Sequence, residues 1–156
     1  MESHDYEIKV VWNNERRGII CSPELDGSLM PKGCIEVATP PEFPKGISGV
    51  WSPEHLFTAS VASCLMTTFL AIAENSKLDF HSFECKALGK LEKTQNGFQM
   101  TRVSLEPEVV VSAEKDKERA LKVLTKSEEH CLITHSVNSE VVMHPMVRVE
   151  NEMELI

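Results

Sequence analysis

The chain has 156 residues, 42% hydrophobic and 26% charged, which is enough to bury the core of one soluble domain, expected to span residues 1–156. Its 24 acidic residues outnumber its 16 basic ones, and a net charge of −8 without a basic face argues against a nucleic-acid partner. The opening MESHDYEIKVVW lacks a basic stretch followed by an apolar run, so it is not typical of a secretory signal.

The first third of the chain predicts a small sheet followed by a loop. The run Tyr6–Trp12 is typical of a strand, and Arg17–Ser22 is its expected hairpin partner across Asn13 and Asn14. Cys34–Ala38 predicts a short third strand. The following TPPEFPKGISG is rich in proline and glycine and therefore predicts an irregular loop.

A long uncharged helix is expected next. Ser52 is a typical N-cap, Pro53 suits the first helical position, and Glu54 places its charge where the helix dipole favours it. We expect this helix to end near Asn75. Its stretch Leu56–Ala73 holds 18 residues without a charge, which is the lower limit for a membrane span. Because five of them are Ser or Thr and no basic cluster flanks them, we interpret a buried core helix and expect no membrane partner.

The second half of the chain predicts a hairpin and a second helix. Two strand-like runs, Phe80–Lys93 and Phe98–Val111, flank the Asn-Gly of TQNG, which is a strong hairpin signal. Ser112 is expected to cap a helix from Ala113 to about His130. The charged side of that helix predicts a solvated face.

The chain ends with one more predicted strand. The apolar segment Val141–Val149 is strand-like, and Pro145 within it indicates an edge or a bulge. Strands thus precede, separate and follow two helices, an order that predicts the α+β class.

The cysteines carry the main chemical signal. There are five, an odd number at irregular spacing, which argues against a secreted disulfide framework and predicts a cytoplasmic protein with one or two thiols of special purpose. Cys21, Cys34 and Cys85 lie in strand patterns beside apolar neighbours, so we interpret them as structural. Cys64 lies within the long helix, where a core thiol is the simple alternative. Cys131 closes the second helix, where packing explains a thiol less readily.

Two thiols that meet in space suit peroxide reduction. A thiolate attacks the O–O bond and becomes a sulfenic acid, and a second thiol condenses with it to a disulfide. A thiolate near neutral pH needs a nearby cation. Arg16 and Arg17 are candidates, and Glu54 could hold a guanidinium in place by a bidentate pair. Simple exposure of both arginines is the alternative.

The stretch WSPEHLFTASVASC resembles the Asn-Pro-Glu-(Gln/Glu)-Leu…Cys signature of the OsmC/Ohr family, the osmotically inducible and organic-hydroperoxide-resistance proteins. The likeness covers most of the chain. It implies an OsmC-like fold, with antiparallel sheets packed around two long helices, in an intertwined homodimer with two interface sites. It also implies a thiol-dependent peroxidase that is regenerated by a dithiol reductant. The resemblance suggests a lipoyl-type dithiol as this reductant.

The resemblance also assigns roles to individual residues. Cys64 matches the peroxidatic cysteine, Cys131 the resolving one, and Glu54 the carboxylate that pairs with the catalytic arginine. The family arginine precedes a glycine in the first hairpin. An Arg-x-Gly match favours Arg16, whereas direct adjacency to the glycine favours Arg17.

Two departures from the family pattern suggest a divergent OsmC-like branch. Leu132 follows the second cysteine where the best-characterised family peroxidases have proline, and Ser52 replaces the usual asparagine. Helix geometry adds a constraint, because Glu54 and Cys64 would lie roughly 15 Å apart on one straight helix. Either that helix is broken near its start, or one subunit supplies a group to the other's cysteine. We therefore expect an obligate dimer.

The predicted substrate is a small apolar hydroperoxide, because the cysteine on the helix has apolar neighbours such as Phe57 and Leu65. No flavin, haem or phosphate-binding motif is present, so no cofactor is expected. One alternative is a zinc site built from His130, Cys131 and His135, completed by Cys64 or His55. Another is a non-catalytic dimer that binds a small apolar ligand or senses oxidants.

Overall fold

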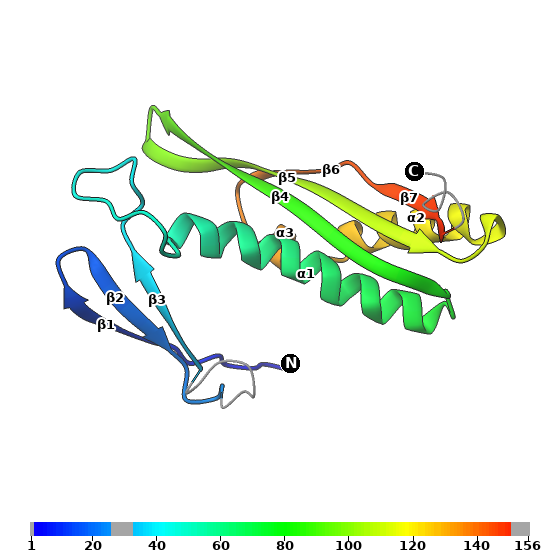
Figure 1. The fold of residues 1–156 in the computed structure, drawn as a ribbon, viewed down its shortest axis with the longest axis horizontal. Helices are drawn as coiled ribbons and strands as arrows, with labels where there is room; N and C mark the ends of the chain where they lie inside the picture. The colour runs from blue at the N-terminus through cyan, green and yellow to red at the C-terminus, as the bar shows by residue number, and fades with distance from the viewer. Residues whose placement is uncertain (1, 26–32, 151–156) are drawn as a thin grey trace. The chain divides into compact units, whose positions relative to one another are not determined.

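The computed structural model, drawn in Figure 1, describes residues 2–25 and 33–150. The chain divides into two compact units, Met1–Leu56 (unit 1) and Phe57–Ile156 (unit 2), which are described separately below.

Unit 1 contains a three-stranded antiparallel sheet. Its strands are β1 (Lys9–Asn14), β2 (Arg17–Cys21) and β3 (Cys34–Ala38), in the order β1-β2-β3. The three predicted strands are confirmed, but the turn expected at Asn13-Asn14 is wrong. Asn14 is still paired with Arg17, and the chain turns at Glu15, which has a φ of 46°. The indole N–H of Trp12 donates to the Glu15 carbonyl over 3.1 Å and fixes the later turn.

Two of the five cysteines are joined in this sheet. Cys21 and Cys34 face each other across β2 and β3 and form a disulfide. The expectation of reduced structural thiols is therefore wrong for this pair. Their separation of 13 positions carries no local signal, because only the strand register places the two residues opposite each other.

The long helix α1 (Pro53–Asn75) has the bounds that the sequence predicts. Its cap is also as expected, since the backbone N–H of His55 donates to Ser52 Oγ over 3.2 Å. By length and composition alone α1 could cross a membrane, and 28% of its most apolar window is buried. Core helices of soluble proteins pass the same test, so this is weak support for a span.

The sheet of unit 2 is built on a long hairpin. The strands β4 (Phe80–Thr94) and β5 (Gly97–Val111) pair antiparallel, as expected from the Asn-Gly signal. The positive φ of 93° at Gly97 is a conformation that glycine adopts without a steric penalty.

Two short strands complete this sheet and correct the prediction of antiparallel sheets. β6 (Glu140–Met143) and β7 (Met146–Val149) both pair parallel to β5, so the sheet is mixed. The single last strand expected from the sequence is thus two strands. They separate at Pro145, which has no N–H to donate, just after the N–H of His144 bonds the Leu105 carbonyl over 2.8 Å.

The second helix begins later than the sequence predicts. A 3₁₀ turn, η2 (Glu114–Asp116), precedes α2 (Lys117–Glu129), and Asp116 is the N-cap without a side-chain capping bond. The expectation of a helix capped by Ser112 is therefore wrong. A further short helix, α3 (Leu132–Ser136), follows directly. α2 has 13 residues against the 23 of α1, so the described residues do not confirm the expectation of two long helices.

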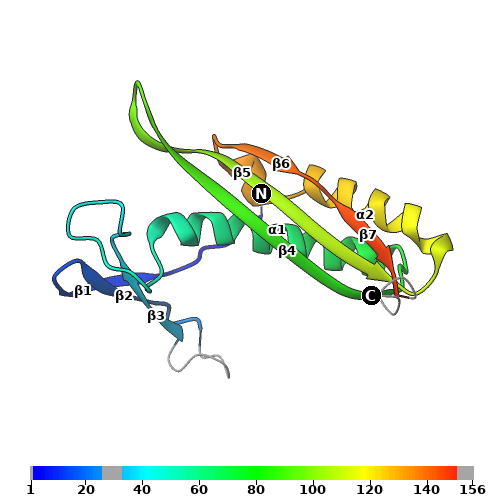
Figure 2. The ribbon, with the colours of Figure 1, turned by 45° about the horizontal axis from the view of Figure 1, so that its top comes forward.

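The core of unit 2 lies between the helices and the strands. Figures 1 and 2 both show α1 running alongside β4 and β5. Phe69 on α1 stacks against Phe80 and Phe83 of β4, with ring centroids 5.1 and 4.9 Å apart. A second cluster joins Val61 and Leu65 of α1 to one valine and one leucine side chain of β5. Burial of these apolar side chains is the main stabilising contribution to the unit.

Candidate active site

Cys64 lies in the middle of α1, on the side of the helix that packs into unit 2. Its side chain is only 8% exposed, and Leu65 beside it is fully buried. One turn later on the same helix face, the Thr68 hydroxyl lies 4.0 Å from Cys64 Sγ. The sulfur therefore has a polar neighbour on its own helix face.

Cys131 connects α2 to α3. It is 1% exposed and is the N-cap residue of α3. Its backbone N–H donates to the Glu128 carbonyl over 3.3 Å, and its own carbonyl accepts a bond of 3.2 Å from the His135 N–H. These backbone bonds hold the thiol at the junction of the two helices.

The two cysteines that the sequence selects meet in unit 2. The Cys131 thiol lies close enough to the Cys64 sulfur for each group to shift the pKa of the other. The backbone N–H groups of Leu132 and Ile133, at the start of α3, face this sulfur and lower its pKa. Ile133 in turn packs against the cluster that contains Leu65. The packing of α3 beside α1 thus surrounds one sulfur with several hydrogen-bond donors.

The surroundings shift the two thiols in opposite directions. Burial raises the pKa of Cys64, but bonds from the Ile133 N–H, the Cys131 thiol, the Thr68 hydroxyl and the Leu132 N–H outweigh burial and lower that pKa below the ordinary thiol value. Burial is the largest influence on Cys131 and raises its pKa; Thr134 partly offsets burial, and the adjacent Cys64 adds to the rise. Cys64 therefore ionises first, and Cys131 keeps its proton.

The other predicted site residues belong to unit 1. Arg16 lies in the exposed turn between β1 and β2, and Glu54 is half-buried in the first turn of α1. Arg17 begins β2, and its Nη1 donates to Glu36 Oε1 on the facing strand over 2.8 Å. A guanidinium–carboxylate pair thus exists in this sheet, with Glu36 as the carboxylate. The pairing of an arginine with Glu54, and its action on Cys64, stay predictions.

The ligand set of the alternative zinc site is not assembled among the described residues. His135 Nε2 donates to the Glu129 carbonyl over 2.7 Å. Across residues 2–25 and 33–150, no group of three or more His, Cys, Asp or Glu side chains is placed to hold a metal ion. The zinc hypothesis therefore has no support in the described part of the chain.

The sequence did not indicate the donors around Cys64. Thr68 follows Cys64 by four positions, a spacing that places both on one helix face, so this contact could have been found. The N–H groups of Leu132 and Ile133 could not, because their contact with Cys64 depends on a short helix that the sequence pattern did not predict.

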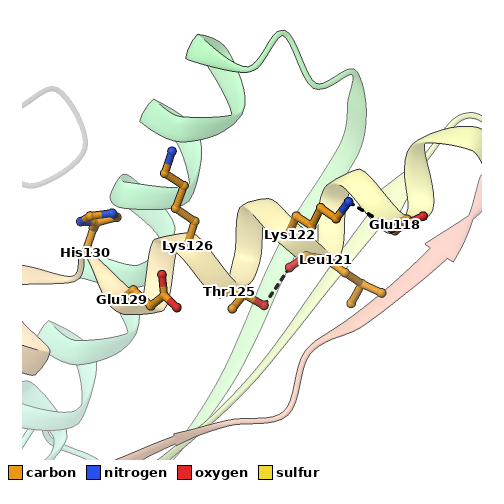
Figure 3. Close-up of a pocket in the computed structure, with 7 residues that line it drawn as sticks. All are labelled: Glu118, Leu121, Lys122, Thr125, Lys126, Glu129 and His130. Atoms are coloured by element: carbon orange, nitrogen blue, oxygen red, sulfur yellow. Dashed lines mark hydrogen bonds and ion pairs between the residues drawn. The ribbon is translucent and has the colours of Figure 1, made fainter.

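A surface hollow along α2 is separate from the two cysteines. It has a volume of about 400 Å³ and lies on the charged side of the helix, as Figure 3 shows. Lys122 and Glu118 form an ion pair of 3.1 Å there, and the Thr125 hydroxyl donates to the Leu121 carbonyl. Because these bonds satisfy the helix's own groups, the hollow fits the solvated face predicted from the sequence.

Comparison with protein families matches residues 46–144 to the OsmC-like protein model, a range that contains Glu54, Cys64 and Cys131. Among curated proteins, the uncharacterized protein YmaD of Bacillus subtilis (strain 168) is 22% identical over 157 residues, which cover 97% of this chain and 100% of YmaD.

Solved structures share the fold. An OsmC-like protein of unknown function from Vibrio cholerae has a TM-score of 0.79 and 25% identity, covering 92% of this chain and 100% of its own. An organic hydroperoxide resistance protein OsmC from Legionella pneumophila has a TM-score of 0.71 and 22% identity, covering 96% and 100%. The organic hydroperoxide resistance protein OhrB of Bacillus subtilis has a TM-score of 0.64 and 18% identity, covering 93% and 98%. With the family match over 46–144, these findings establish that the chain belongs to the OsmC/Ohr family of OsmC-like proteins.

Proposed function

We propose that this protein is a thiol-dependent peroxidase that reduces organic hydroperoxides, with Cys64 as the peroxidatic and Cys131 as the resolving cysteine. The observation that supports this most directly is the proximity of two buried free thiols whose pKa values shift in opposite directions. Hydrogen-bond donors favour the anion at Cys64, while Cys131 stays protonated. A nucleophilic thiolate in contact with a second thiol is the arrangement that two-cysteine peroxide reduction needs.

The first step breaks the peroxide bond. The Cys64 thiolate attacks the terminal oxygen of ROOH, the O–O bond breaks, and its electron pair leaves on the alkoxide. The Cys131 thiol is the adjacent proton donor, and its proton converts the alkoxide to the alcohol ROH. The products are a sulfenic acid on Cys64 and a thiolate on Cys131.

The second step joins the two sulfurs. The Cys131 thiolate attacks the Cys64 sulfur, and hydroxide leaves. The hydroxide takes up a proton from solvent and forms water, which balances the proton that Cys64 released when it ionised. Over both steps, two thiols and one hydroperoxide give one disulfide, one alcohol and one water. A dithiol such as dihydrolipoamide then reduces the disulfide by two thiol–disulfide exchanges. A cytoplasmic location suits a cycle that depends on such a reductant.

The proposal includes a homodimer in which one subunit completes the other's site. α1 has no break near its start, so Glu54 and Cys64 lie on one continuous helix. The rise along that helix separates the two residues by about 15 Å. We therefore assign the carboxylate, and the arginine that it orients, to the second subunit. Exposed apolar side chains on β1, including Trp12 at 74% exposure, supply surface for such an interface.

Steady-state peroxide consumption tests the function. Wild type should consume cumene hydroperoxide catalytically with dihydrolipoamide, and faster than it consumes hydrogen peroxide. Cys64→Ser should lose at least about a thousandfold of this activity, because no nucleophile remains. Cys85→Ser is the matched control and should retain full activity, since Cys85 is outside the thiol pair. Consumption of a single equivalent by wild type, without turnover in excess dithiol, would instead identify an oxidant sensor.

A further inference from the structure

A second pair of sulfur atoms occurs in the chain, apart from the proposed peroxidase pair. Cys21 ends β2 and Cys34 begins β3, and their disulfide belongs to unit 1. Cys64 and Cys131 belong to unit 2 and are both free thiols. The peroxidase cycle proposed above does not use the first pair, so it needs an explanation of its own.

The strand register brings these two cysteines together. Cys21 is directly opposite Cys34, and the backbone N–H of Ser22 donates to the Gly33 carbonyl, one residue beyond the pair on each strand. In an antiparallel ladder this pattern makes Cys21 and Cys34 a non-hydrogen-bonded pair, the type in which facing side chains lie closest. Their Cα atoms are 4.2 Å apart. The sheet therefore holds the two sulfurs within bonding reach whenever its strands are paired.

A small molecule can approach this pair. Both cysteines are only partly buried. Cys34 also lines a hollow of about 260 Å³ in unit 1, together with Glu36, Gly49 and Trp51. Reaction with a small disulfide or thiol requires access to one of the two sulfurs, and the hollow beside Cys34 is the approach that we assign to it.

We propose that Cys21 and Cys34 are a second, independent redox pair that exchanges with low-molecular-weight disulfides and thiols such as the two forms of glutathione. One cysteine thiolate attacks a small disulfide RSSR, which releases one thiolate RS⁻ and leaves a mixed disulfide on the protein. The second cysteine, as thiolate, displaces the remaining RS⁻ group and forms the Cys21–Cys34 bond. Two protein thiols and one RSSR thus give one protein disulfide and two RSH.

Oxidation of this pair fixes the sheet that carries the candidate arginines. β2 runs from Arg17, paired with Ala38, to Cys21, paired with Cys34. The disulfide therefore ties the strand pair at the end opposite Arg17, whose guanidinium bonds Glu36 across the same two strands. Reduction leaves this five-residue ladder held by its backbone bonds and the Arg17–Glu36 ion pair, so we expect the reduced sheet to open more often.

Thiol counting in a Cys64→Ser/Cys131→Ser background tests the proposal without the peroxidase pair. The reduced protein is equilibrated with mixtures of reduced and oxidised glutathione, quenched in acid, alkylated and weighed by intact-protein mass spectrometry. As the oxidised share rises, two of its three thiols should become resistant to alkylation, and peptide mapping should show a Cys21–Cys34 cross-link. Cys85 should stay reduced and therefore open to alkylation, because burial raises its pKa, which slows its exchange with glutathione disulfide.

A Cys21→Ser change in the same background is the matched control. Cys34 should then accumulate as a mixed disulfide with glutathione, because no second thiol displaces it. Two outcomes in the Cys64→Ser/Cys131→Ser protein would overturn the proposal. One is three alkylatable thiols at every glutathione ratio, and the other is a cross-link that joins Cys21 to Cys85 or to another chain. Since neither variant retains the peroxidase cysteines, an absence of peroxidase activity in wild type has no bearing on this result.

Discussion

The chemistry of Cys64 depends on the groups that contact its sulfur. A buried thiol ordinarily resists ionisation, and desolvation is the largest single influence on Cys64. The donors around it, two backbone N–H groups, one thiol and one hydroxyl, together reverse this effect. The proposed nucleophile is thus prepared by several hydrogen bonds within unit 2, to which an arginine of a second subunit would add.

The Cys131 thiol should have two separable roles, as a hydrogen-bond donor and as the resolving sulfur. Cys131→Ser keeps a donor and loses the sulfur, whereas Cys131→Ala loses both. We expect Cys131→Ala to raise the pKa of Cys64 and to slow its alkylation by iodoacetamide at pH 7 about tenfold, since a bond to a charged group contributes about 1.5 kcal/mol. Cys131→Ser should remain near the wild-type rate.

A pH profile of the same alkylation checks the direction in which the pKa values of Cys64 and Cys85 are shifted. The rate rises with pH as the thiol loses its proton, so a lowered pKa moves the inflection to lower pH. The Cys64 inflection should lie below that of Cys85, whose pKa is raised by burial. Equal inflections for Cys64 and Cys85 would contradict the opposite shifts of their pKa values. Identical alkylation rates in the two Cys131 variants would contradict the assignment of Cys131 as donor.

Among the elements, α1 shows how far local sequence rules reach. Ser52, Pro53 and Glu54 predict its start, and the structure places the start and the capping bond there. The family pattern has asparagine in place of Ser52. Ser52→Ala should therefore lower the free energy of unfolding by about 1 kcal/mol, whereas Ser52→Asn should restore most of it. Thermal denaturation measures both, and equal melting temperatures for the two variants would argue against the cap.

The contact between α1 and β4 depends on a glycine. A Cβ at Gly89 would collide with the Thr58 hydroxyl and lie 2.7 Å from Met100 Cε. We expect Gly89→Ala to destabilise the protein by about 1–3 kcal/mol through overpacking. Lys90→Ala, on the neighbouring exposed position of the strand, is the control and should change stability little. Denaturant unfolding distinguishes the two, and an unchanged Gly89→Ala midpoint would contradict the close approach.

Several elements could not be predicted, each for a physical reason. The turn at Glu15 depends on a bond from the Trp12 indole, and the split of the last strand depends on where the His144 N–H finds its acceptor. The 3₁₀ turn before α2 and the short helix α3 have no distinctive pattern. The Cys21–Cys34 bond follows from strand register, which is a tertiary property. The sequence thus singled out the two cysteines of the proposed site, but not the groups that lower the pKa of Cys64.

At the scale of the whole molecule, the proposed site requires two chains. Variant mixing tests this directly. Cys64→Ser and Glu54→Gln should each be inactive alone. Dimers formed by unfolding and refolding the two together should contain one native site, in which Cys64 of one chain meets Glu54 of the other. About a quarter of wild-type activity should return on random pairing. No recovery in verified mixed dimers would place Glu54 and Cys64 of one chain in the same site, whereas an active Glu54→Gln variant would remove Glu54 from catalysis.

The central claim is that Cys64 reacts with the hydroperoxide and Cys131 resolves the product. Mass spectrometry of the reduced protein after one equivalent of cumene hydroperoxide measures this most directly. Wild type should lose two hydrogens, and peptide mapping should show a Cys64–Cys131 bond. Cys131→Ser should gain one oxygen on Cys64, trapped with dimedone, and Cys64→Ser should show no fast reaction. Rapid oxidation of Cys64→Ser at Cys131, or a wild-type protein whose Cys64 stays reduced, would contradict the account.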